Sequence, residues 1–157
     1  MPKIVIFDLD GTLAIIDYRM RLATGGKTTE GNYKKINWDI LHDPANIELD
    51  VPNVPIVEIC RLLAEDGYTI YIFSGRSDKT ATATLSWLSR NKVPFKKLVM
   101  RPHKTMGFVP DEILKKDMLD KHLDINNIFM VVDDRQKVVD MWRSLGLTCL
   151  QVAEGNF

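Results

Sequence analysis

The sequence predicts an α/β fold in which helices cover both faces of a central, mainly parallel sheet. Three short apolar runs rich in β-branched residues, at 3–7, 69–73 and 128–132, are typical of buried strands. Segments with apolar residues at helical spacing lie between these runs. Strands that alternate with helices favour right-handed crossovers, and therefore a parallel sheet.

The other elements follow from the same patterns. Two weaker strand candidates are residues 97–100 and 148–152. In the first helical segment, Ile56, Cys60 and Leu63 recur at helical spacing, and Gly67 supplies a stop signal. The predicted helices span residues 54–66, 79–92, 111–123 and 136–145.

Residues 15–53 break this alternation and are too many for an ordinary connection. We expect them to form a small cap, inserted after the first strand, over the sheet edge where ligands bind in open parallel sheets. Trp38 and Tyr33 within it would either stack on a base or, as we favour for Trp38, form a miniature core. No linker-like stretch divides the chain, so residues 1–157 are predicted to form a single domain.

Composition narrows the functional classes. With 21 basic and 21 acidic residues, the formal net charge is zero, which argues against broad, charge-driven wrapping of nucleic acid. No apolar run approaches the length of a membrane helix, and the early acids exclude a signal peptide. Cys60 and Cys149 are expected to be buried thiols in a reducing compartment. We therefore expect a cytoplasmic protein without membrane association, and no obligate protein partner is evident.

Paired carboxylates are the most informative feature. Asp8 and Asp10 follow the first strand, and Asp133 and Asp134 end the strand at 128–132. Turn formation or helix capping would explain single acids here, but not two pairs. If the two strands are neighbours, four carboxylates converge, and their repulsion calls for a cation. All-oxygen ligation favours Mg²⁺.

Two further segments suit a phosphate. Ser74, Gly75 and Arg76 end the second strong strand and offer a hydroxyl, backbone N–H groups and a guanidinium, although a solvent-facing turn would look the same. Lys115 and Lys116 lie in the helix after Pro110, where most lysines merely cover a helix face.

Taken in order, these residues resemble the motifs of haloacid dehalogenase-like phosphatases. That family has Asp-x-Asp-Gly-Thr, then Ser or Thr, then Lys, then paired acids; here these are Asp8 to Thr12, Ser74, Lys115 or Lys116, and Asp133-Asp134. Arg19, Arg76 and the spacing from Asp111 to Lys115 are similar to the phosphatase half of bacteriophage polynucleotide kinase-phosphatases. The similarity spans most of the chain outside residues 20–52.

This resemblance implies a three-layer Rossmannoid fold and a mechanism. Asp8 would attack phosphorus and form an aspartyl-phosphate. Mg²⁺ would be held by Asp8, the Asp10 carbonyl, and Asp133 or Asp134, with the choice between the last two left open. Asp10 would be the general acid and base, and we expect neighbouring carboxylates to raise its pKa towards neutrality.

Other family positions would bind the substrate. Ser74, the Gly75 amide and a lysine would hold the transferring oxygens. The spacing favours Lys115 over Lys116, with Asp111 orienting it from the same helix face. Arg19 and Arg76 would each grip a phosphate.

The resemblance also implies a substrate, namely a 3′-phosphate on a nucleic-acid end or a nucleotide. A 5′-nucleotidase or another small-molecule phosphatase is the alternative, because fold does not fix substrate. A non-catalytic phospho-acceptor module would not need the second acid, Asp10. A basic group at Arg101, His103 and Lys104 either attracts a polyanion or is a solvated loop.

Overall fold

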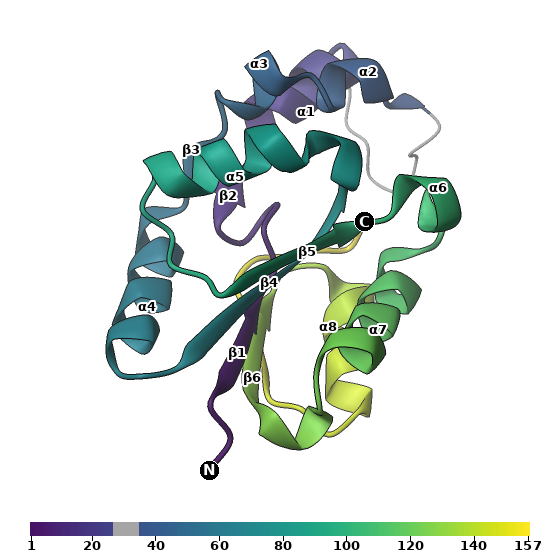
Figure 1. Ribbon diagram of the computed structural model, residues 1–157. Coiled ribbons are helices and arrows are strands. Elements are labelled where there is room, and N and C mark those ends of the chain that lie inside the picture. Colours follow the sequence, from purple (N-terminus) through teal and green to yellow (C-terminus); the bar gives the residue numbers. More distant parts are fainter. Residues whose placement is uncertain (27–34) are drawn as a thin grey trace.

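A parallel sheet of five strands forms the centre of the protein, seen here in a computed structural model that describes residues 1–26 and 35–157 (Figure 1). The strand order is β5-β4-β1-β6-β7, and every neighbouring pair is parallel. The prediction of an α/β fold with a mainly parallel sheet is confirmed, and both weaker strand candidates are strands. The strands are β1 (Ile4–Phe7), β4 (Thr69–Ser77), β5 (Lys97–Arg101), β6 (Ile128–Asp133) and β7 (Cys149–Gln151).

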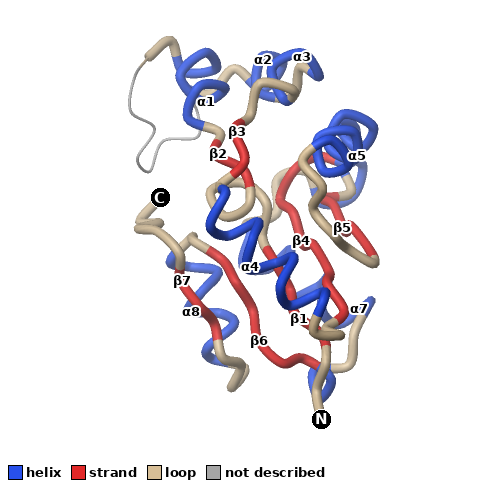
Figure 2. The backbone as a smooth tube through the Cα atoms, turned by 90° about the vertical axis from the view of Figure 1, so that its left-hand side faces the viewer, coloured by secondary structure: helices blue, strands red, loops and turns tan. Residues whose placement is uncertain are grey.

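Helices cover both faces of the sheet and make three layers. α4 and α5 lie on one face, and α7 and α8 lie on the other (Figures 1 and 2). These four are the predicted helices: α4 (Val54–Glu65), α5 (Ala81–Arg90), α7 (Asp111–His122) and α8 (Gln136–Ser144). Shorter helical turns among the described residues outside the insertion are η2 (Asp78–Thr80), α6 (His103–Met106) and η3 (Ile125–Asn127).

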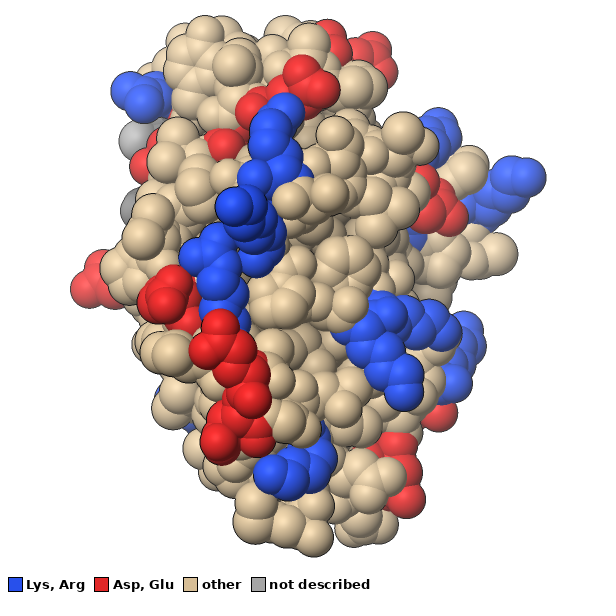
Figure 3. Space-filling view, turned by 60° about the vertical axis from the view of Figure 1, so that its left-hand side comes forward, with Lys and Arg blue, Asp and Glu red and all other residues tan. Residues whose placement is uncertain are grey.

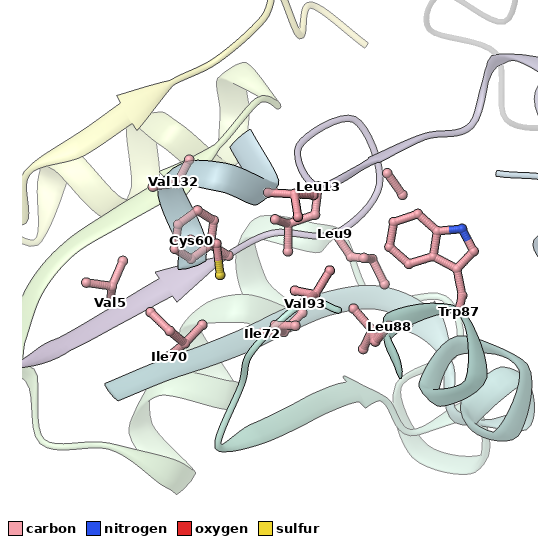
Figure 4. Packing of buried hydrophobic residues seen from close by; sticks show 13 residues of the cluster. Val5, Leu9, Leu13, Cys60, Ile70, Ile72, Trp87, Leu88, Val93 and Val132 are labelled. Carbon is pink, nitrogen blue, oxygen red and sulfur yellow. The ribbon is translucent and has the colours of Figure 1, made fainter. Parts of the chain in front are cut away.

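Alternation along the strands divides the hydrophobic core in two. Val5 and Phe7 of β1 face α4 and α5, whereas Ile6 between them faces α7 and α8. The first cluster includes Cys60 of α4 and Trp87 of α5 (Figure 4). Because both faces of β1 are buried, its sequence is apolar throughout, as is typical of a parallel sheet.

The insertion after β1 lies over the carboxyl ends of the strands (Figure 1). Its two ends are joined where β2 (Ala14–Ile15) pairs in antiparallel fashion with β3 (Val51–Pro52). Between them lie α1 (Asp17–Thr24), α2 (Trp38–Leu41) and α3 (Pro44–Ile47). The side chains of Asn37 and Asp43 cap the first backbone N–H groups of α2 and α3.

The insertion has a small core of its own, but Trp38 is not part of it. Ala23, Ile36 and Leu41 are the buried members. Trp38 is 47% exposed and contacts the ring of His42, so our preference for a core role was wrong. As the first residue of α2, it lies at the helix end rather than on the buried face. Tyr33 lies outside the described residues.

None of the described helices is long and apolar enough to cross a membrane. Charges of both signs share the surface. On the face shown in Figure 3, a row of Lys and Arg side chains runs directly into a group of Asp and Glu side chains. This mixture agrees with a formal net charge of zero.

The two thiols should be inert in the folded protein. Cys60 and Cys149 are buried and unpaired, and burial raises the pKa of each thiol to about 12. Since the thiolate is the reactive form, iodoacetamide at pH 8 should leave both unmodified in native protein and modify both in guanidinium chloride. Mass spectrometry would count the adducts. Rapid modification of native protein would contradict the burial described here.

Candidate active site

Three acidic side chains meet where β1 and β6 end. Asp8 directly follows β1, Asp133 is the last residue of β6, and Asp134 comes next. The two strands are neighbours, so their carboxyl ends lie side by side. One carboxylate oxygen from each residue lies within 4.8 Å of the other two, and all three residues are buried. The arrangement concentrates negative charge in a small volume shielded from water.

Lys115 of α7 supplies a positive charge within this group. Its Nζ donates to Asp8 Oδ1 and to Asp133 Oδ2, each at 2.8 Å, and the residue is 2% exposed. Burial alone would lower the pKa of Lys115, but the carboxylates of Asp133 and Asp8 outweigh it and raise the pKa. Lys116 points away and pairs with Asp120 on the surface. Of the two lysines, only Lys115 reaches the acidic group.

Burial also acts on the carboxylates. It raises the pKa of Asp8 well above its usual value; Lys115 opposes the shift, while Asp133 and Asp134 add to it. Burial likewise raises the pKa of Asp134. Thr12 Oγ1 donates to Asp8 Oδ2 at 3.1 Å. One ammonium group does not offset the charge of three carboxylates, and the other donors that reach them in the described structure are neutral. The group therefore favours uptake of protons or of a cation.

Gly11 allows Asp134 to approach the loop after β1. Its φ is +83°, which L side chains rarely adopt, and a Cβ at this position would lie 2.2 Å from Asp134 Oδ2. Two physical constraints thus favour glycine at this position of the Asp-x-Asp-Gly-Thr motif: the left-handed backbone and the carboxylate packed directly against it.

Asp10 does not join the other three carboxylates, and two of our expectations for it were wrong. Its Oδ1 accepts from Arg76 Nη2 at 2.6 Å, from Arg76 Nε at 2.9 Å and from Arg19 Nη2 at 3.2 Å. Burial would raise its pKa, but these guanidiniums, Arg76 more than Arg19, lower the pKa of Asp10 to about 2. Three rather than four carboxylates converge, and the neighbours that set the Asp10 pKa are cations.

Arg19 and Arg76 share a second carboxylate, which sequence reasoning missed. Asp50 accepts from Nη2 of both arginines, each at 2.8 Å, and from Arg19 Nε at 3.0 Å. All three side chains are almost fully buried. The expectation that each guanidinium grips a phosphate is wrong. Neither is open at the surface, because Asp10 and Asp50 already bind both. No periodic pattern singled out Asp50; its only signal was an acid between Leu49 and Val51.

The segment Ser74 to Arg76 lies within β4, in the irregular stretch between Phe73 and Ser77 where the pairing with β5 shifts register. Ser74 is buried, and its Oγ accepts from the Arg76 backbone N–H at 3.1 Å. A Cβ on Gly75 would lie 3.0 Å from Asp111 Oδ1, which leaves little room for a side chain. This part of β4 therefore lies directly against the start of α7.

Asp111 does not orient Lys115, contrary to our expectation. Its Oδ2 accepts from Arg135 Nη1 at 2.7 Å, and its Oδ1 accepts from Arg101. Arg101 also donates from Nε to the Gly75 carbonyl at 2.9 Å. Arg101 and Arg135 thus hold Asp111, and Arg101 links it to Gly75, while Asp8 and Asp133 hold Lys115. Arg101 is thus an internal clamp rather than a member of a solvated loop.

Comparison of the chain with known protein families gives a match over nearly its whole length. The family model described as the polynucleotide kinase PNKP phosphatase domain matches residues 2–157. The chain belongs to this family. It is a haloacid dehalogenase-like phosphatase, a hydrolase, as the resemblance of its motifs predicted.

Solved structures of similar proteins extend the comparison. Chains in the structure of a Pnkp1/Rnl/Hen1 complex and in that of the Pnkp1/Rnl/Hen1 RNA repair complex are 28% and 29% identical, each with a TM-score of 0.76 and with 100% of this chain covered. This PNKP-type phosphatase domain spans about half of those chains, 48% and 44%. A protein from Clostridium difficile described as a phosphatase is 17% identical, with a TM-score of 0.72 over 99% of this chain and 88% of its own; it shares the fold.

Substitution of Gly11 should disturb this phosphatase domain more than an ordinary left-handed glycine would. Gly11→Ala adds backbone strain and forces the Asp134 carboxylate to move, so we expect a loss of about 2–4 kcal/mol in the free energy of unfolding. Gly146→Ala is the matched control, because its φ is +82° and nothing lies within 4 Å of the added Cβ. It should lose about 1–2 kcal/mol. Equal losses in urea titrations would contradict the contact between Gly11 and Asp134.

The Asp10 pairing should show in acid titration. Its pKa is lower in the folded protein (about 2) than the ordinary 3.8, so the ionised carboxylate stabilises the fold. This contribution is fully present above pH 4 and is lost as the pH falls from about 4 to about 2. In metal-free buffer, Asp10→Asn should lower the free energy of unfolding at pH 7 by about 1–2 kcal/mol, and the difference should shrink across this window. A constant difference would argue against the pairing.

Proposed function

We propose that this protein is a Mg²⁺-dependent phosphomonoesterase that forms an aspartyl-phosphate on Asp8 and removes 3′-phosphates from polynucleotide ends or nucleotides. The observation that carries the proposal is the buried group of Asp8, Asp133 and Asp134 with Lys115 between two of its members. A plain structural ion pair would need one carboxylate for one lysine. The excess acids lie at the sheet edge where open parallel sheets bind ligands.

The donor set fits Mg²⁺. With all four groups ionised, three carboxylates and one ammonium leave two negative charges, which one divalent cation would offset. Oxygen donors suit Mg²⁺, which retains several waters. Asp8, Asp133, Asp134 and the main-chain carbonyl of Asp10 would hold it. When bound, the ion would supply positive charge between the nucleophile and the phosphoryl oxygens.

Asp8 is the proposed nucleophile. Lys115 and Thr12 bind its two oxygens and fix its orientation. In the first step an Asp8 oxygen would form a bond to phosphorus as the bond to the leaving oxygen breaks. Ser74 Oγ, the Gly75 N–H and Lys115 would hold the transferring oxygens, and the links from Asp111 through Arg101 to Gly75 would keep this part of β4 in place.

Asp10 is the proposed general acid and base. Among the described residues, the N–H groups that donate to it all bind Oδ1, so Oδ2 would give a proton to the leaving alkoxide and later take one from the attacking water. The low pKa of Asp10 describes the site without substrate. An arriving phosphate dianion would raise it by like-charge repulsion. Arg19 and Arg76 then act on the substrate through Asp10.

The substrate assignment rests on family membership. The matching model is that of a polynucleotide kinase phosphatase domain, and the similar chains come from complexes, one of which is described as an RNA repair complex. We propose that residues 15–53 form a cap over the site and that residues 1–157 act as one domain. We also propose that the protein acts in the cytoplasm.

A phosphate-release assay tests this proposal. Wild-type protein should release phosphate from a 3′-phosphorylated oligonucleotide and from 3′-mononucleotides with Mg²⁺ and not with EDTA. Asp8→Asn should abolish turnover, and Asp10→Asn should lower it by about 100-fold or more. The neighbouring lysines give a matched pair: Lys115→Met should lose about 100-fold or more, whereas Lys116→Met should stay within about twofold.

Three outcomes would contradict the proposal. A preference of more than tenfold for 5′-phosphates in kcat/KM would favour a 5′-nucleotidase. Full activity in EDTA would exclude the metal. A protein that accepts phosphate on Asp8 and is indifferent to Asp10→Asn would be a phospho-acceptor module. Circular dichroism of each variant establishes that the fold is kept.

A further inference from the structure

A buried carboxylate to which the proposed reaction gives no role lies beside the catalytic loop. Asp50, the residue before β3, is 6% exposed and belongs to the insertion. Its Oδ1 accepts from Arg19 Nε, and its Oδ2 accepts from Nη2 of both Arg19 and Arg76. Asp50 therefore joins two guanidinium groups that come from different parts of the fold, one from α1 and one from β4.

The same guanidiniums hold Asp10 by one oxygen only. Arg76 donates to Oδ1 through Nε and Nη2, and Arg19 donates to Oδ1 through Nη2. Within the part of the chain that the structure describes, no hydrogen bond reaches Oδ2, and 28% of the Asp10 side chain is exposed. The orientation of the carboxylate is thus set from one side, and its other oxygen is left for a substrate.

The frame around the guanidiniums is anchored to the rest of the fold. Trp87 Nε1 donates to the main-chain oxygen of Asp50 at 2.8 Å. Thr84 Oγ1, also on α5, accepts from Arg76 Nη1 at 3.1 Å. Two guanidiniums here face two carboxylates. Without the charge of Asp50, two buried cations would share Asp10 alone, and their mutual repulsion would disturb the arrangement around it.

We propose that Asp50 is a positioning residue that acts through Arg19 and Arg76 to keep Asp10 Oδ2 turned towards the leaving group. The inference rests on the proposed function, in which Asp10 protonates the leaving alkoxide. A purely structural ion pair would stabilise the insertion and affect all substrates alike. A positioning role instead affects those substrates whose leaving group needs a proton.

The test compares two leaving groups. The alkoxide of thymidine 3′-monophosphate needs a proton as it departs, whereas the phenolate of p-nitrophenyl phosphate leaves without one. The parameter to measure is kcat/KM, because it reports only the steps up to release of the alcohol. For Asp50→Asn we expect the kcat/KM for the nucleotide to fall at least about tenfold more than that for p-nitrophenyl phosphate. Equal falls on both substrates would overturn the proposal.

Two further variants guard against trivial effects. Asp43→Asn removes an exposed carboxylate from the same insertion without touching either arginine, and should change neither kcat/KM. Thr84→Val keeps every charge and removes one acceptor from Arg76, so it should fold even if Asp50→Asn does not. For Thr84→Val we expect the kcat/KM for the nucleotide to fall about threefold more than that for p-nitrophenyl phosphate. If kcat/KM falls equally for the two substrates in both Asp50→Asn and Thr84→Val, the positioning role is contradicted.

A crystal structure of Asp50→Asn, or of Thr84→Val if the former does not fold, separates this inference from the proposed function. We expect the Asp10 carboxylate to be rotated or to occupy two orientations there, and to have one orientation in the wild type. Unchanged Asp10 geometry would overturn the positioning role even in an active enzyme. A wild-type protein that cleaves neither phosphate would contradict the proposed function, and the Asp10 geometry would still decide whether Asp50 positions it.

Discussion

The charge imbalance among Asp8, Asp133, Asp134 and Lys115 is the constraint on which the rest of the site depends. Carboxylates brought within 4.8 Å of one another and buried repel each other strongly, and the raised pKa values of Asp8 and Asp134 express that cost. Lys115 offsets only part of it. The fold tolerates this group because the parallel order of β1 and β6 fixes where both chains leave the sheet, with apolar residues packed on both faces. The uncompensated negative charge therefore favours binding of a cation at this site.

A second group of charges lies next to the first and is balanced. Asp10 and Asp50 face Arg19 and Arg76, two charges of each sign. Two acids separated by a single residue thus belong to different electrostatic environments. The reason is the backbone, which leaves the strand direction after Asp8, where the N–H groups of Leu13 and Ala14 both donate to the carbonyl of Leu9. The pKa of Asp8 is therefore raised, while the pKa of Asp10 is lowered.

The bend of the backbone after Asp8 also explains which parts of the site could be predicted from the sequence. Strand and helix patterns depend on local periodicity and burial, so they predicted the sheet and placed Asp8 and Asp133 at the ends of two strands. They did not give the strand order, and the structure shows that the two strands are neighbours. The expectation that Asp10 would join them extended the alternation of β1 beyond its last residue. Asp50 could not be found in this way, because its importance depends on two arginines distant in sequence. The helical spacing of Asp111 and Lys115 was real, but buried partners on other elements outweighed an exposed-helix pairing rule.

The insertion is attached to the catalytic loop by more than its chain connections. Asn53, which follows β3, donates from its backbone N–H to the Leu13 carbonyl at 2.8 Å and from Nδ2 to the Thr12 carbonyl at 3.0 Å. Together with the pairing of β2 and β3, these bonds fix the start and end of the insertion relative to the loop that carries Asp10. Asp50 lies three residues before Asn53, so its carboxylate is placed by the same contacts. The insertion contributes one cation, Arg19, and one anion, Asp50, to the ion pairs around Asp10. It therefore orders the surroundings of Asp10 without changing the net charge that the three converging carboxylates present to a cation.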